Sequence, residues 1–190
     1  MRLISGVVQS TPIPWLPVLS NIAPPEIRRN EALVRLFIKT DAYKNSILYK
    51  YLENAPDIRP KSRKPPWVKA RELIQSQFCS AKKWQEERLG NAALHKNLIK
   101  DPTQRVKGFE LLWREWVILN RLRTGHGRCG HMMFKWKLKD SPECDCGNDS
   151  QTMRHITDEC PNRRFESGII GINEVTKQAF EWIRALDIEI

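Results

Sequence analysis

The chain has 190 residues, which suffices for one domain with a hydrophobic core or for two small domains. Its 41% apolar content excludes a disordered tail, and no apolar run has the length of a membrane span, so we expect no membrane partner. Residues 61–139 carry 19 Lys and Arg against 6 Asp and Glu, whereas residues 140–190 carry 5 against 11. A basic middle region is typical of a protein that binds nucleic acid, although a solubilising surface explains it equally well.

Residues 1–25 are predicted to form a proline-rich arm. Prolines stand at positions 12, 14, 17, 24 and 25, and each removes an amide donor and disfavours a helical conformation of the preceding residue. We therefore expect an extended segment that packs its apolar side chains onto a neighbouring surface, of this chain or of a missing partner. These side chains are Trp15, Leu16, Val18 and Leu19.

Residues 26–100 are predicted to be a basic helical region. The first helix begins near Glu26, after two prolines, and a second begins with Asp41 as its N-cap. Residues 54–66 break the pattern as a linker, and helices over 67–79 and 82–98 follow. The first helix has a core-facing stripe at three- and four-residue steps: Ile27, Leu33, Val34, Phe37 and Ile38. The isolated Cys79 is interpreted as a small buried hydrophobic residue.

Residues 101–139 are predicted to form a pair of amphipathic helices. The first begins at Asp101 and ends near Arg123, and the second covers about residues 128–138 after a turn with two glycines. The aromatic side chains of the first helix have helical spacing and are interpreted as core rather than as base-stacking platforms: Phe109, Trp113 and Trp116. No strand pattern occurs, so the fold is predicted to be mainly α.

Basic side chains flank this turn and continue along the second helix. They are candidate nucleic-acid contacts, because guanidinium groups and turn amides can meet one phosphate together. The candidates are Arg121, Arg123, His126, Arg128, Lys135 and Lys137. A helix–turn–helix corner with solvated arginines is an equally good interpretation.

Residues 140–165 contain four metal-ligand side chains in the pattern C-x-C-x8-H-x4-C: Cys144, Cys146, His155 and Cys160. Three thiolates and one imidazole complete a tetrahedral zinc site and leave no position for a substrate, so the expected Zn²⁺ is structural. We expect a short helix over 151–159, with Cys160 beyond its last regular turn. The alternative is a set of buried, unliganded cysteines.

The remaining features concern compartment and catalysis. An odd number of cysteines, five, and the absence of a signal-peptide pattern favour a reducing, intracellular location, with nucleus and cytoplasm both possible. No Walker loop, no H-E-x-x-H and no G-x-S-x-G occurs, so we expect no enzymatic activity of this chain by itself. Residues 166–190 are predicted to be a C-terminal helix.

Four motifs resemble the C-terminal end of the reverse-transcriptase polyprotein of jockey-like non-LTR retrotransposons. They are TPIPWLPVLSNIAPPEIRR at 11–29, LNRLRTGHGRCGHMMFKW at 119–136, DSPECDCGNDSQTMRHITDECP at 140–161 and FEWIRALDIEI at 180–190. The resemblance implies that residues 1–25 end the polymerase thumb region. It also implies a CCHC zinc knuckle with the four ligands named above, which helps to hold template RNA or target DNA.

The same resemblance implies partners and an ancestry. The partners would be RNA, DNA, or both, and the remainder of the reverse transcriptase if it is present. The polymerase carboxylates of the family lie outside these residues, so the chain would be a catalytically silent fragment. The other hypotheses are a zinc-stabilised protein-interaction module and a decayed copy with no retained role.

Overall fold

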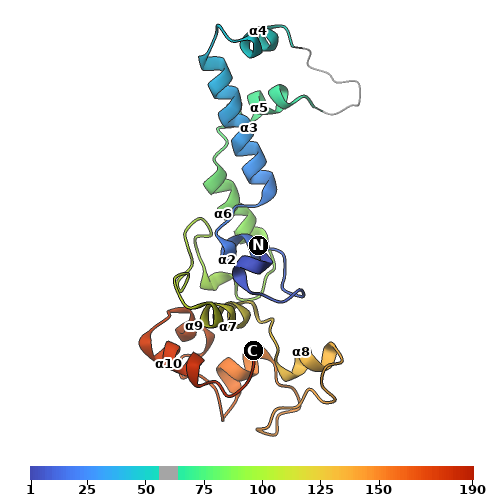
Figure 1. The fold of residues 1–190 in the computed structure, drawn as a ribbon, viewed down its shortest axis with the longest axis vertical. Coiled ribbons are helices and arrows are strands. Elements are labelled where there is room, and N and C mark those ends of the chain that lie inside the picture. Colours follow the sequence, from blue (N-terminus) through green and yellow to red (C-terminus); the bar gives the residue numbers. More distant parts are fainter. Residues whose placement is uncertain (56–63) are drawn as a thin grey trace. The chain divides into compact units, whose positions relative to one another are not determined.

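The computed structural model describes residues 1–55 and 64–190 and divides the chain into two compact units (Figure 1). Unit 1 combines Met1–Ile22 with Arg88–Ile190, and unit 2 is Ala23–Glu87. The described residues contain helices and no strand, which confirms the predicted mainly α fold. Most of the predicted linker over 54–66 lies outside the described residues. None of the described helices combines the length and the apolar character that crossing a membrane requires.

Unit 2 is built on α3 (Pro25–Ala42), which packs against α4 (Ile47–Glu53) and α5 (Pro66–Gln75). Both α3 and α5 begin with proline, whose missing amide donor costs nothing in a first turn. The predicted start of the first helix is confirmed. The predicted N-cap is wrong, because α3 continues through Asp41 and Ser46 caps α4 by accepting a 3.1 Å hydrogen bond from the Tyr49 amide.

The later helices of the basic region are shorter than predicted. α5 ends at Gln75 because Gln77 adopts a left-handed conformation (φ 52°) and the Phe78 amide bonds back to the Leu73 carbonyl at 2.9 Å. α6 (Ser80–Gly90) is followed by a separate 3-10 turn, η1 (Lys96–Leu98). Cys79 is exposed, so its interpretation as a buried hydrophobic residue is wrong.

The N-terminal segment of unit 1 is helical and buried, not an extended arm. α1 (Arg2–Ser5) and α2 (Trp15–Ser20) pack together, and the prolines at positions 14 and 17 fall at the start of α2, where helix amides need no partner. Trp15 is fully buried in a core with Val106 and Trp116. The surface that the segment covers therefore belongs to this chain.

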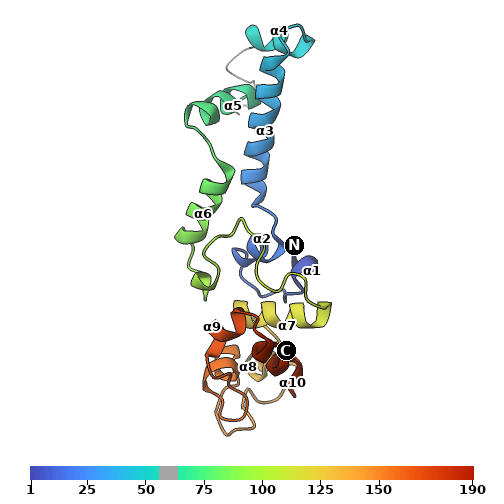
Figure 2. The same cartoon turned by 90° about the vertical axis from the view of Figure 1, so that its left-hand side faces the viewer.

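α7 (Trp113–Thr124) is the central helix of unit 1, and the remaining elements pack around it (Figure 2). The Trp116 Nε1 donates to the Ile4 carbonyl at 2.9 Å, which holds α1 against α7. The elements that follow are α8 (Gly130–Lys135), the π-helical turn η2 (His155–Glu159), α9 (Gly168–Asn173) and α10 (Lys177–Ala185).

Three predictions for this region are wrong. No helix begins at Asp101, because its Oδ1 accepts from the Thr103 amide at 3.0 Å and forms a local turn. The single C-terminal helix is two helices, broken at Val175 in a left-handed conformation (φ 57°). Trp113 is 58% exposed at the start of α7 and is not a core residue.

Candidate metal centre

The four predicted ligands come together in unit 1. The ligand atoms of Cys144, Cys146, His155 and Cys160 all lie within 4.8 Å of one another, and three of these side chains are buried. The Cys144 and Cys160 sulfurs are 3.9 Å apart, and the Cys146 sulfur is 3.2 Å from His155 Nε2. This Cys₃His group can hold a metal ion.

A tight turn presents the first two sulfurs. The Cys144 amide donates to the Asn148 carbonyl at 2.8 Å, and the Gly147 amide donates to the Cys144 carbonyl at 3.0 Å. Gly147 has φ 89°, a conformation that side chains with a Cβ rarely adopt, so glycine is the residue suited to this position. This turn brings the sulfurs of Cys144 and Cys146 within 4.8 Å of each other.

The other two ligands sit at the ends of η2. Residues five apart on an α-helix point about 140° away from each other, so a regular helix would separate them. Here the Cys160 amide donates to the His155 carbonyl at 2.6 Å, and this wider π-type bond brings the two side chains to one side. Cys160 follows the last turn of η2, which confirms the prediction for its position.

Arg163 was missed by the sequence reasoning and lies beside the sulfur cluster. Its side chain is only 7% exposed, donates to the Asp145 carboxylate and to Asp187 Oδ1 at 2.7 Å, and places Nη1 3.9 Å from the Cys144 sulfur. Hydrogen bonds from Arg163 hold the pKa values of Asp145 and Asp187 below their usual range. Its only sequence signal is a basic residue three positions after the last ligand, in an acidic region.

The thiols differ in their environments. Burial raises the pKa of the Cys144 thiol to about 11, so a nearby cation is needed to favour its thiolate. Burial also acts to raise the pKa of Cys160, but hydrogen bonds from the Asn162 amide and neighbouring groups bring it below the ordinary value. A bound cation and Arg163 would both favour the thiolate form of Cys144.

His155 has a carboxylate beside its second ring nitrogen. His155 Nδ1 lies 3.8 Å from Glu159 Oε2, and Glu159 Oε1 is paired with Arg154 Nε at 3.0 Å. Nδ1 is buried and has no hydrogen-bond partner within the described part of the chain. A carboxylate in this position suits a histidine that ligates through Nε2, because it orients the ring.

Gln151 joins the metal cluster to α8. Its side-chain Nε2 is 3.5 Å from the Cys144 sulfur, and its Oε1 accepts from the Gly130 amide at 2.8 Å. Its backbone carbonyl accepts from the His131 amide at 3.0 Å. The first turn of α8 is therefore attached directly to the loop that carries the ligands.

One of the predicted nucleic-acid contacts, Arg123, is not accessible to a ligand. Arg123 is fully buried, and its guanidinium donates to Asn173 Oδ1 at 2.8 Å and to the Lys107 carbonyl at 2.6 Å, so it cannot contact a phosphate. Burial lowers the pKa of Arg123 to about 9.

The other predicted nucleic-acid contacts differ in how exposed they are and in whether they already have a partner within the chain. Arg121 is half-buried and donates to the Gly6 carbonyl at 3.2 Å, and Arg128 pairs with Glu189 at 3.0 Å. His126 is half-buried, and burial lowers its pKa. Lys135 and Lys137 are exposed at the end of α8.

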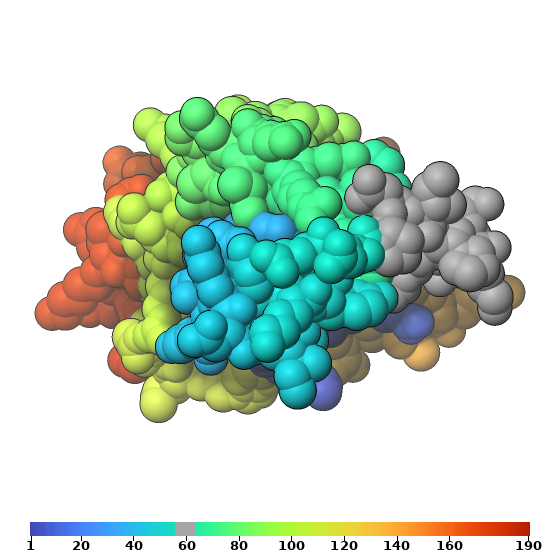
Figure 3. Space-filling model, turned by 90° about the horizontal axis from the view of Figure 1, so that it is seen from above, coloured from blue at the N-terminus to red at the C-terminus, as the bar shows by residue number. Residues whose placement is uncertain are grey.

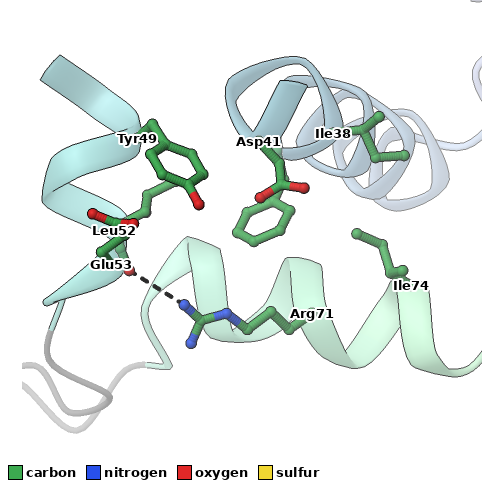
Figure 4. A pocket seen from close by; sticks show the side chains of 8 residues that line it. Ile38, Asp41, Tyr49, Leu52, Glu53, Arg71 and Ile74 are labelled. Atoms are coloured by element: carbon green, nitrogen blue, oxygen red, sulfur yellow. Dashed lines mark hydrogen bonds between the residues drawn. The ribbon is translucent and has the colours of Figure 1, made fainter. Parts of the chain in front are cut away.

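Unit 2 contains a cavity of about 430 Å³ between α3, α4 and α5 (Figure 4). Asp41 and Glu53 line it together with apolar side chains, and Arg71 donates to the Leu52 carbonyl at 3.3 Å across one end. Both carboxylates are exposed, and the cavity is open to solvent.

Comparisons with protein-family models, curated proteins and solved structures found no match for this chain.

Proposed function

We propose that unit 1 is a nucleic-acid-binding module whose fold is held together by a structural Zn²⁺. A zinc–sulfur bond of about 2.3 Å in a tetrahedron separates two sulfurs by about 3.8 Å. The 3.9 Å between the Cys144 and Cys160 sulfurs is close to this separation. Thiolates also favour zinc over hard cations, and four protein ligands leave no position open for catalysis.

The observation that carries the nucleic-acid proposal is the lysine segment after the metal-anchored helix. Lys135, Lys137 and Lys139 are exposed, and none of them forms an ion pair with another described residue. Phe134 beside them is 46% exposed and can stack on a base. Gln151 fixes the other end of α8 to the metal loop, so the ion would keep these side chains in place.

The resemblance to jockey-like reverse transcriptases supports template RNA or target DNA as the ligand. On this proposal the chain is the part of such a polyprotein that holds nucleic acid, and the polymerase chemistry belongs to the remainder. The metal-bound thiolates suit an intracellular, reducing compartment.

The test is a titration of zinc-loaded protein against labelled single-stranded RNA at two salt concentrations. Each phosphate contact contributes about −0.7 to the slope of log affinity against log salt, so replacing Lys135, Lys137 and Lys139 by alanine should reduce the magnitude of this slope by about 2. The matched control replaces three exposed basic residues that carboxylates already neutralise, namely Arg105, Lys107 and Lys177. An absence of binding by the unaltered protein even at low salt would refute the proposal.

A second candidate function, protein interaction, is favoured by unit 2. Parts of unit 2 face the viewer in Figure 3. Large apolar side chains are exposed on α4 and the second half of α3: Leu36, Ile38, Ile47, Leu48 and Tyr51. Exposed apolar patches of this kind mark interaction surfaces. Sedimentation of the protein over a range of concentrations tests self-association, and Ile47→Lys should abolish any association that uses this surface.

A further inference from the structure

We propose that a groove between α7 and α10 binds a base with an exocyclic amino group, above all cytosine, within a single-stranded nucleic acid. This inference rests on the proposed function and adds a base-reading site to it. The groove consists of two adjoining cavities of about 340 and 360 Å³. Both are lined by Arg114, Ile118 and Ile183, so they share a wall, and both lie within unit 1.

The first cavity contains a buried carboxylate with one unused oxygen. Glu115 is 6% exposed in the first turn of α7, and its Oε1 accepts from Arg184 Nε at 2.7 Å. Its Oε2 is buried and has no hydrogen-bond partner among the described residues. Buried carboxylate oxygens almost always accept a hydrogen bond. We therefore infer that a bound ligand donates a hydrogen bond to this oxygen. Both Glu115 and its partner Arg184 line the first cavity, and the Arg184 side chain is exposed.

The charges around Glu115 define the rest of the ligand. Arg114 is exposed and forms no ion pair within the described part of the chain, and Arg184 stacks 4.6 Å from the centre of the Phe180 ring. A lysine or arginine side chain could satisfy Glu115, but these two arginines would repel it. The ligand must donate a hydrogen bond to Glu115 and must not be repelled by the two arginines. A nucleotide meets both requirements, because its base can donate a hydrogen bond and its phosphate is negatively charged.

Cytosine matches the first cavity better than uracil does. Its N4 amino group donates to a carboxylate, whereas uracil presents a carbonyl oxygen at the same position and would be repelled. Leu112 and Ile118 provide apolar walls for the ring. Trp113, 58% exposed, lines the second cavity and can stack on the neighbouring base, with Arg114 between the two for the connecting phosphate.

The experiment compares oligo(C) and oligo(U) of about 8 nucleotides, by fluorescence anisotropy with zinc-loaded full chain at neutral pH. We expect about tenfold tighter binding of oligo(C), from one discriminating base contact. Glu115→Gln should bring the ratio close to one, because an amide can donate as well as accept. Arg114→Ala should weaken both oligonucleotides equally, while the control Arg105→Ala, an exposed residue paired with Glu110, should change neither.

A ligand-side measurement keeps the test independent of folding. Oligonucleotides of N4,N4-dimethylcytidine lack the amino donor and should bind no better than oligo(U), even if Glu115→Gln fails to fold. Two results would refute base recognition in the groove but would not contradict the proposed function. One is salt-dependent binding with no preference between oligo(C) and oligo(U), and the other is a preference for oligo(C) that persists after dimethylation of the amino group. Binding of neither oligonucleotide would overturn both.

Discussion

Arg163 and Arg123 are both largely buried guanidinium groups of unit 1, and their partners give them different roles. Arg163 meets two carboxylates and approaches the Cys144 sulfur, so its charge serves the metal centre. Arg123 meets neutral groups, an asparagine side chain and a backbone carbonyl among them, so it serves the packing of α7. Both residues are arginines with largely buried side chains, so their different roles follow from the different groups that they contact.

Replacing Arg163 by glutamine should lower the metal affinity by about 10- to 100-fold, the usual effect of removing an outer-shell partner. The substitution leaves Asp145 and Asp187 without their shared cation. Competition with a coloured zinc chelator measures the affinity. Arg164→Gln, an exposed neighbour, is the control, and equal affinities of the two variants would contradict the role of Arg163.

Arg123→Ala should reduce the free energy of unfolding by roughly 2–4 kcal/mol, because it leaves buried acceptors without donors. Lys137→Ala should change it by less than about 0.5 kcal/mol, since the side chain is exposed. Urea denaturation followed by tryptophan fluorescence gives both values. If the Arg123→Ala protein is as stable as the unaltered protein but binds RNA more weakly, Arg123 is a nucleic-acid contact after all.

At the scale of elements, the metal loop and α8 form one connected structure. Gln151 contacts the Cys144 sulfur on one side and the first turn of α8 on the other, so order in the loop is transmitted to the helix. Within the described part of the chain, the core formed by α2 and the start of α7 includes no residue of the metal loop. Loss of the metal should therefore act locally.

Chelation of the metal, or Cys144→Ser or Cys160→Ser, should expose amides over residues 140–165 and in α8 to hydrogen exchange. Amides of α2 should keep their protection, because their core does not include the metal loop. Exchange followed by mass spectrometry resolves the two regions. Cys79→Ser, which changes an exposed cysteine of unit 2, should leave zinc content and protection unchanged. Full zinc content in both ligand variants would refute the ligand assignment.

At the scale of the whole molecule, the two units divide the proposed functions. Unit 1 contains the candidate metal centre, the lysine segment and the groove, and unit 2 contains the exposed apolar side chains. Trp15 and Arg88, from the two segments of unit 1, are in contact, with the guanidinium 4.2 Å from the ring centre. We therefore expect that a short linker can join the two segments.

Replacing residues 23–87 by a Gly/Ser linker of about 10 residues, with an average span near 18 Å, should leave a folded unit 1. We expect this protein to keep its zinc stoichiometry and its salt-dependent RNA binding, and to lose any self-association. Metal analysis, anisotropy and sedimentation measure the three properties. Loss of zinc binding in a soluble, helical product would show that the metal centre depends on unit 2.

The sequence by itself determined the helical fold class, the start of α3 and the four members of the Cys₃His group that can hold a metal ion. These depend on local chemistry: proline at a first helical turn, apolar periodicity, and ligand types at short spacing. Only the tertiary structure decided that the N-terminal segment is buried against α7, that Arg123 is internal and that Arg163 lies beside the Cys144 sulfur. Each of these features depends on contacts between residues far apart in the chain. Such contacts decide whether a charged side chain meets solvent or a buried partner, and residue type and spacing alone do not specify these contacts.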